Sequence, residues 1–457
     1  MPNLTDLDAT DLSNALAERT CTAEEVMAET LAAIAARNPA VNALVSLLDP
    51  DALMAEARAA DRADRRGWLH GIPMAIKDLY DAADLPTTQG SPLFSDTVAK
   101  TDAGFVRRLR AAGAIIIGKT NVPQFGLGSH SVNPIFGATR NPYDAGLSAG
   151  GSSGGAAAAL AVRLVAVADG SDAMGSLRNP AAWNNVYGFR PTVGLVPGET
   201  ADSAIVHRLS TLGPMARSPA DLEALLTTMS DGAYQGAPAP KSPRLAWLGD
   251  WGGAYRCEAG ILDLAETAIA DMEALGWQIE AIAPPVPAGL LWDTWTDLRS
   301  FVTALSLGVH WREPQARRHL NPQTQWETAR GLTLTAARIE RAQADRQVWL
   351  AAAAQVFTRF DALLLPATQV WPFPIDDAWP QRIGGADLDT YHRWMEVMIP
   401  ASLAGLPALA LPAGFGSAGL PGGLQLIGPA GADGRLLALG KLWHAATAWP
   451  TRRKPAL

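Results

Sequence analysis

The chain has 457 residues, of which 48% are apolar and 18% are charged, a balance typical of a folded globular protein rather than a disordered one. Its net charge of -8 argues against a nucleic-acid partner, because phosphate binding needs a basic surface. The only cysteines are Cys21 and Cys257, so the sequence has neither a disulfide framework nor a cysteine-rich metal site.

Two stretches bear on where the protein acts. The first residues include Asp6 and Asp8 and lack the basic-then-apolar pattern of a secretory signal, which predicts a cytoplasmic protein. The longest uncharged run, 397–432, is interrupted by five prolines, whereas a membrane span needs roughly 20 continuous apolar residues. We therefore interpret this run as buried strands and turns, and we expect no membrane partner.

The first third of the chain alternates predicted helices with short apolar strands. Thr22 and Glu25 have the spacing of a capping box, which predicts a helix from there to about Arg37. The apolar run 72–78 delivers Lys77 at its end, a position where a lysine is ordinarily a solvated strand terminus. The other elements expected here are helices over 51–65 and 102–112, a fully buried strand over 114–118, and a loop with short turns over 125–141.

The stretch 149–155 reads Ala-Gly-Gly-Ser-Ser-Gly-Gly and precedes an alanine-rich helix predicted over 156–161. An apolar strand over 164–168 and a second loop over 169–178, which contains Ser176, are expected to follow. Composition alone allows three interpretations. The stretch could be a tight connection into a packed helix, a phosphate cradle that lacks the Lys-Ser/Thr ending of a P-loop, or part of a hydrolase with a nucleophilic serine.

The second half of the chain also alternates strands and helices. Eight of its fifteen tryptophans lie between Trp292 and Trp394, where they either pack helices or line an apolar pocket. The expected elements after a connector at 235–243 are strand 244–248, helix 260–275, strand 278–282, mostly helix over 295–360, and a buried strand ending at 366. The β-α-β order predicts a parallel strand pair. The whole pattern predicts an α/β sandwich with a central mixed, twisted sheet flanked by helices.

Several separate motifs, in the same order, resemble the amidase signature family of serine hydrolases. The resemblance runs almost without interruption from about Gly71 to Pro191 and continues more weakly to the end. Its motifs are Lys77 at a strand end, Gly118-Lys119-Thr120-Asn121, Gly137–Pro142, Gly150–Gly155, Asp172–Arg178 and Gly188–Pro191. It implies a single domain over 1–457, with an N-terminal helical segment (1–65), a core (about 66–230) and a more variable, substrate-shaping part (about 231–457).

The resemblance implies a Ser-Ser-Lys triad and neither a metal nor a cofactor. Ser176 matches the nucleophile, Ser152 matches a bridging serine on a cis peptide bond, and Lys77 matches the base. The backbone N–H groups of Ala173, Met174, Gly175 and Ser176 match the oxyanion hole. We expect Asp172 and Arg178 to pair and to brace this loop.

Amide hydrolysis fits this assignment physically. The nucleophile must be deprotonated as it attacks, and a free lysine, with a pKa of about 10.4, would be protonated at neutral pH. Burial among apolar neighbours such as Ile76 would lower that pKa. A neutral Lys77 could then take the proton of Ser176 through Ser152 and deliver it to the leaving amine.

The substrate pocket is less clearly marked. Gly126, Leu127 and Gly128 correspond to a pocket wall in the family, and His130 is a candidate pocket residue rather than a base. Where the family commonly has two glycines, this chain has Met174-Gly175; we expect Met174 to avoid the left-handed backbone region and to shape the acyl pocket. The sequence Trp183-Asn184-Asn185 also departs from the common pattern and resembles a subgroup that includes hydrolases of linear and cyclic amides of ω-amino acids.

The predicted function is hydrolysis of small carboxamides through an acyl-enzyme on Ser176. Apolar or aromatic amides and linear or cyclic ω-amino acid amides are the substrate classes considered, with esters and carbamates as further options. The alternatives are the glutamine-hydrolysing subunit of a tRNA-dependent amidotransferase and a non-catalytic phosphate- or nucleotide-binding protein. The expected partner is the amide substrate, and a homodimer is left open.

Overall fold

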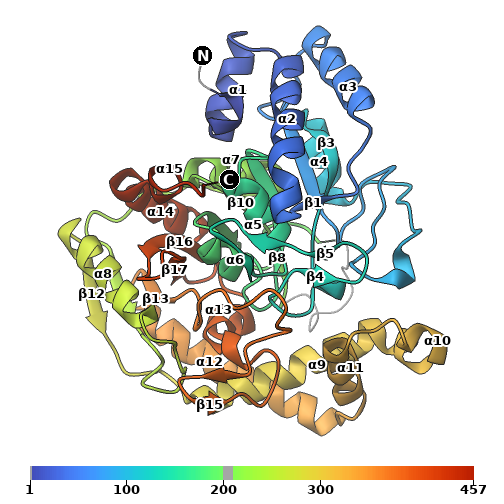
Figure 1. Ribbon diagram of the computed structural model, residues 1–457. Coiled ribbons are helices and arrows are strands. Elements are labelled where there is room, and N and C mark those ends of the chain that lie inside the picture. Colours follow the sequence, from blue (N-terminus) through green and yellow to red (C-terminus); the bar gives the residue numbers. More distant parts are fainter. Residues whose placement is uncertain (1–2, 199–208, 457) are drawn as a thin grey trace.

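The apolar runs assemble into an eight-stranded mixed sheet at the centre of the molecule, which confirms the predicted α/β class (Figure 1). The computed structural model describes residues 3–198 and 209–456, so the remaining parts of segments 1–65, 66–230 and 231–457 lie outside the described residues. In spatial order the strands are β12 (Gln278–Ala281), β11 (Arg244–Trp247), β13 (Ala362–Pro366), β17 (Pro421–Ile427), β16 (Ala408–Phe415), β9 (Tyr187–Arg190), β10 (Thr211–Ala216) and β8 (Val167–Asp172).

The direction of the strands explains why the sheet is mixed. β11 runs parallel to both β12 and β13, as predicted for the β-α-β unit, and the remaining neighbours are antiparallel. Successive residues of β13 pack into different apolar clusters, Leu364 into one and Leu363 and Leu365 into the other. Both faces of the sheet are therefore buried, which is why its strands are almost continuously apolar.

A smaller sheet carries the predicted base. It consists of β1 (Leu44–Val45), β3 (Ile115–Thr120) and β2 (Pro73–Lys77), with β2 parallel to β3. The backbone N–H of Lys77 donates a hydrogen bond of 3.1 Å to Asp169 Oδ1 on β8. This contact fixes the end of β2 beside the edge strand of the large sheet.

Helices cover the sheets, with α1 (Ala9–Ala17), α2 (Ala23–Val41) and α3 (Pro50–Arg62) gathered at one end in Figure 1 and α9–α12 at the opposite end. α2 begins with the predicted capping box of Thr22 and Glu25. Within the described residues, no helix is both long enough and apolar enough to cross a membrane. The others are α4 (Gly104–Ala111), α5 (Gly154–Ala161), α6 (Arg178–Trp183), α7 (Pro219–Met229), α8 (Ile261–Ala274), α9 (Ala288–Arg312), α10 (Pro314–Arg317), α11 (Pro322–Leu332), α12 (Ala336–Phe357), α13 (Ile399–Ala404), α14 (Asp433–Thr447) and α15 (Trp449–Arg452).

Two sequence predictions need correction. The strand predicted at 164–168 is β8, which begins at Val167 and continues to Asp172, because it pairs in register with all six residues of β10. Pairing to a neighbour thus extends the strand into residues whose polarity suggested a loop. The run 397–432 is not only strands and turns: it begins with α13, in which Pro400 occupies the first turn, where a helix tolerates proline.

The glycines of 149–155 are occupied by close packing. A Cβ atom at Gly155 would lie 2.3 Å from the backbone nitrogen of Asn121, and one at Gly154 would lie 2.5 Å from Ser131 Oγ. All eight residues of α5 are buried. The space beside these glycines is filled by protein atoms, which argues against a phosphate cradle at this loop.

Candidate active site

Lys77 is completely buried at the end of β2 and points into a group of hydroxyls. Its Nζ donates hydrogen bonds to the Oγ atoms of Ser152 (2.9 Å), Ser153 (2.8 Å) and Ser171 (3.1 Å). Complete burial lowers the pKa of Lys77 to about 7, although the charges of Asp169 and Asp172 act in the opposite direction. A substantial fraction of Lys77 is therefore an uncharged amine near neutral pH.

Ser152 lies at the turn that leads into α5 and follows a cis peptide bond between Gly151 and itself. Its side chain is nearly buried and lines a cavity that Ser176 also lines. Both serines are among the described residues, and no hydrogen bond joins their hydroxyls in this structure. The backbone N–H of Ser153 bonds to the carbonyl oxygen of Ser176 at 3.3 Å, which ties the two serine-bearing loops together.

The loop before Ser176 presents its backbone toward the same cavity. Gly175 has φ +88, a left-handed conformation that favours glycine, whereas Met174 does not have a positive φ, as predicted. The N–H of Gly175 is already donated to Asp172 Oδ1 at 2.8 Å. The N–H groups of Ala173, Met174 and Ser176 make no hydrogen bond to a described residue, so they are the donors that remain for an oxyanion.

Asp172 and Arg178 form a buried, bidentate ion pair, which confirms the predicted brace. Nε of Arg178 lies 2.9 Å from Oδ2 and Nη2 lies 3.0 Å from Oδ1. Burial by itself would raise the pKa of Asp172, but Arg178 and Arg190 outweigh it and hold that pKa well below its usual range. Arg178 also reaches Gln425 Oε1 at 2.6 Å, so the pair joins the nucleophile loop to β17.

We expect Arg178→Met to lower the free energy of unfolding by roughly 3–5 kcal/mol, because it leaves the Asp172 carboxylate buried without its main partner. Urea denaturation measures this loss. The control is Arg341→Met, which removes an i,i+4 ion pair with Asp345 from a side chain that is 78% exposed and should change the stability by less than about 1 kcal/mol. Equal losses in the two variants would contradict a bracing role.

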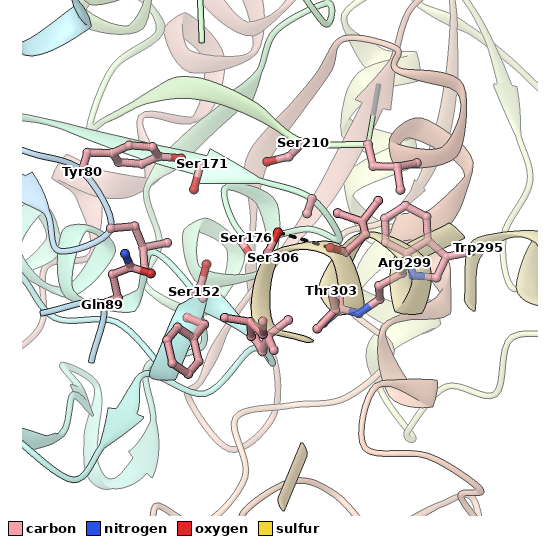
Figure 2. Close-up of a pocket in the computed structure, with 18 residues that line it drawn as sticks. Tyr80, Gln89, Ser152, Ser171, Ser176, Ser210, Trp295, Arg299, Thr303 and Ser306 are labelled. Atoms are coloured by element: carbon pink, nitrogen blue, oxygen red, sulfur yellow. Dashed lines mark hydrogen bonds between the residues drawn. The ribbon is translucent and has the colours of Figure 1, made fainter. Parts of the chain in front are cut away.

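A cavity of about 320 Å³ opens beside the two serines. Figure 2 shows Tyr80, Gln89, Ser152 and Ser171 on one side and Trp295, Arg299 and Thr303 of α9 on the other. The remaining described lining residues are Leu79, Phe125, Gly126, Leu127, Ala173, Ser176, Leu209, Ser210, Val302, Ser306 and Leu307. The cavity is therefore largely apolar with a few polar groups, as is typical of a site for a small organic substrate.

The structure separates the expected pocket residues into two groups. Gly126 and Leu127 line the cavity, whereas Gly128 and His130, both described, do not. The two ring nitrogens of His130 lie within hydrogen-bond distance of Ser148 Oγ (2.7 Å) and the carbonyl oxygen of Ile375 (3.0 Å). Its ring is thus held between two segments of the protein rather than presented to a substrate.

Met174 lies one layer behind the cavity wall. Its side chain is buried, and its Sδ accepts a hydrogen bond of 3.1 Å from Nε1 of Trp295, which does line the cavity. The Met174 side chain therefore supports a wall residue instead of forming the wall. Trp394, from the same tryptophan-rich region, is buried in the core, where it stacks on Trp183 at 5.5 Å.

Sequence reasoning missed three contributions to this site. Ser153 and Ser171 bond directly to Lys77, although the motif pattern suggested no catalytic contact for either. The cavity wall formed by α9 comes from a part of the chain with only weak family similarity, and its polar residues Arg299 and Thr303 follow Trp295 at four-residue spacing. That spacing along one helix face was the available signal.

Comparisons with known proteins agree with this geometry. The family model described as "Amidase" matches residues 25–437. The chain belongs to the amidase signature family. The match spans nearly the whole chain, which confirms the resemblance and identifies the protein as an amidase.

This amidase is similar along its full length to proteins with different activities. It is 31% identical to the amidase-family component of a glutamyl-tRNA(Gln) amidotransferase from Pseudomonas putida, covering 98% of each chain. It superimposes on a bacterial aryl acylamidase with a TM-score of 0.89 at 25% identity, covering 98% of this chain and 99% of the other. A 6-aminohexanoate cyclic dimer hydrolase, solved with substrate, gives a TM-score of 0.87 at 25% identity, covering 99% of each chain.

Proposed function

We propose that the amidase hydrolyses small carboxamides with an apolar portion through an acyl-enzyme on Ser176, with Ser152 and Lys77 as its proton relay. The observation that carries this proposal is the buried Lys77 amine, with a pKa of about 7, hydrogen-bonded to Ser152 at the cavity shared with Ser176. An uncharged amine beside a hydroxyl at a substrate-sized cavity is what general-base activation of a serine requires.

In the acylation step, Ser176 Oγ attacks the amide carbon and its proton passes through Ser152 to Lys77. The carbonyl oxygen becomes an oxyanion, which the free N–H groups of Ala173, Met174 and Ser176 stabilise. Lys77 returns the proton through Ser152 to the amide nitrogen as the C–N bond breaks, so the amine leaves uncharged. The two serine hydroxyls close into a hydrogen bond when substrate binds, since catalytic contacts are often long without a ligand.

In the deacylation step, a water takes the place of the amine and loses its proton to Lys77 through Ser152. The new tetrahedral intermediate uses the same backbone donors. Its collapse breaks the ester bond to Ser176, which regains a proton, and releases the carboxylic acid. Each cycle returns Lys77 to its uncharged form.

The cavity lining supports apolar or aromatic substrates. Phe125, Leu127, Trp295 and Leu307 contribute apolar surface. The similarity to the aryl acylamidase and the cyclic dimer hydrolase is consistent with aryl amides and with amides of ω-amino acids. Esters and carbamates remain further candidates, because their leaving groups need less assistance than an amine.

Glutamine hydrolysis for a tRNA-dependent amidotransferase is the second candidate, because of the 31% identity to the Pseudomonas putida protein. Glutamine carries an α-ammonium group, and none of the described cavity-lining residues is acidic. We therefore expect the isolated enzyme to hydrolyse aryl amides at least about tenfold faster, in kcat/KM, than glutamine.

A panel of anilides, aliphatic amides, ω-amino acid amides and glutamine, read by mass spectrometry, tests this preference. The background control is Ser176→Ala on the same panel. Preferential glutamine hydrolysis, or glutaminase activity that appears only with added partner proteins, would overturn the proposal in favour of the amidotransferase function.

We also propose a cytoplasmic enzyme that works without nucleic acid. The net charge of -8 and the free thiols of Cys21 and Cys257 support this. A homodimer stays a prediction from the sequence, and light scattering of the purified protein measures it.

A further inference from the structure

Arg299 is the one charged side chain among the described residues that line the cavity. It lies on α9, four residues after Trp295 and four before Thr303, so the three side chains share one helix face. Its side chain is buried, with the residue only 8% exposed. A buried cation facing a substrate cavity needs a reason, because removing a charge from water is costly unless it is paired.

The Arg299 guanidinium is held rigidly at two of its three nitrogens. Nε lies 3.2 Å from Oε2 of Glu327, and Nη2 donates to the hydroxyl of Tyr391 at 2.7 Å. Glu327 is itself fully buried and accepts a hydrogen bond of 2.9 Å from Ser300. Nη1 makes no hydrogen bond to a described residue, so it is the nitrogen left for a ligand, on a fork whose orientation is already fixed.

The charges around Arg299 do not balance. Glu327 and Asp297 are the carboxylates of the hydrogen-bonded network that joins α9, α11 and α12. The same network contains three guanidinium groups, those of Arg299, Arg330 and Arg338. Arginine stays protonated in proteins, so the network has one positive charge in excess, and Arg299 is its member at the cavity.

We propose that Arg299 binds a carboxylate of the substrate, and hence that the preferred substrates are amides with a carboxylate remote from the scissile bond and without a free amino group. The absence of an acid from the described lining supports the second condition. This inference rests on the proposed amidase function. Arg299 acts as a specificity-determining residue, since it binds a part of the substrate that does not react.

Matched chromogenic amides test the proposal. The mono-4-nitroanilide of glutaric acid carries a carboxylate on its acyl chain, and pentanoyl 4-nitroanilide is the same chain without it. The butyryl amide of 4-aminobenzoate carries a carboxylate on the amine side, and butyranilide is its neutral match. We expect wild type to prefer one carboxylate amide over its neutral match. Arg299→Met should lower kcat/KM for that amide roughly 10- to 100-fold and for the neutral match less than about threefold.

Two further proteins guard against misfolding. Arg299→Met leaves Glu327 buried and unpaired, so Arg299→Met with Glu327→Met removes the whole pair, an exchange that folded proteins usually tolerate. The double variant should lose the same carboxylate preference. Arg341→Met, which removes an exposed arginine of α12 with a side chain 78% exposed, is the control and should keep that preference.

Binding separates this inference from the proposed function. In Ser176→Ala protein, isothermal titration should show tighter binding of a carboxylate anilide than of its neutral match, and adding Arg299→Met should remove the difference. If wild type hydrolyses no amide while this difference remains, the proposed function is wrong and the carboxylate site stands. If neutral anilides are hydrolysed but neither kcat/KM nor binding favours a carboxylate, the carboxylate site is wrong and the amidase function stands.

Discussion

Replacing Ser176 with alanine should reduce kcat for a 4-nitroanilide by at least about 10⁴-fold, because no other side chain can take over a covalent step. Ser176 is 7% exposed and lines the cavity, and the donors left for an oxyanion belong to its own loop. Removing the hydroxyl therefore leaves binding and oxyanion stabilisation but no acyl-enzyme. Intact-protein mass spectrometry after mixing with substrate should show an acyl adduct on wild type and none on the variant.

Ser210→Ala is the matched control for this prediction. Ser210 also lines the cavity, but it makes no hydrogen bond to Lys77, whose partners are Ser152, Ser153 and Ser171. We expect the control to retain activity within about tenfold, since a lining hydroxyl contributes at most a single hydrogen bond to binding. An acyl adduct that persists in Ser176→Ala would identify a different nucleophile.

Replacing Lys77 with alanine should have the second largest effect, and the effect should depend on the leaving group. General acid–base catalysis contributes about 10²–10⁴-fold, and an amine must be protonated as it departs. We expect a loss near the upper end of that range for anilides. A smaller loss is expected for 4-nitrophenyl esters, because nitrophenolate leaves without a proton.

The ratio of the two losses is the informative measurement. Lys77→Met fills more of the buried volume than alanine and should give the same ratio, which separates proton transfer from packing. Equal losses on amides and esters in both variants would show that Lys77 does not protonate the leaving amine.

The pH dependence of wild type provides an independent test of Lys77. Burial lowers the pKa of Lys77 to about 7, and the base is the deprotonated form. Consequently kcat/KM for a neutral amide should rise with pH, reach half of its maximum near pH 7 and level off above it. Asp169→Asn removes a negative charge that raises the Lys77 pKa, so its midpoint should move to lower pH. A wild-type midpoint near the ordinary lysine pKa of about 10.4 would contradict an uncharged base.

Local sequence pattern was a good guide where backbone and burial decide the structure. The capping box at Thr22 predicted the start of α2, and the continuous apolar residues of 114–118 predicted β3. These predictions succeeded because capping and burial act on neighbouring residues. The strand at 164–168 was misplaced because the partner that defines β8, the strand Thr211–Ala216, lies more than forty residues away in the chain.

The motifs around the site located residues but not contacts. Lys77, Ser152 and Ser176 were selected by their resemblance to a family, and spacing in the sequence carries no information about which hydroxyls surround the amine. Ser153 and Ser171 reach Lys77 only because α5 and β8 converge beside β2. The same convergence gives Lys77 its complete burial and its lowered pKa.

By itself the sequence determined the family, the α/β class and the residues proposed to carry the reaction, because these depend on motifs that stay recognisable along the chain. Only the tertiary structure decided that Met174 stands behind Trp295, that His130 is held away from the cavity, and that Arg299 faces it. These facts depend on how α9, β8 and the loop after β3 pack against one another. Such packing joins residues more than a hundred positions apart, and short-range pattern does not encode it.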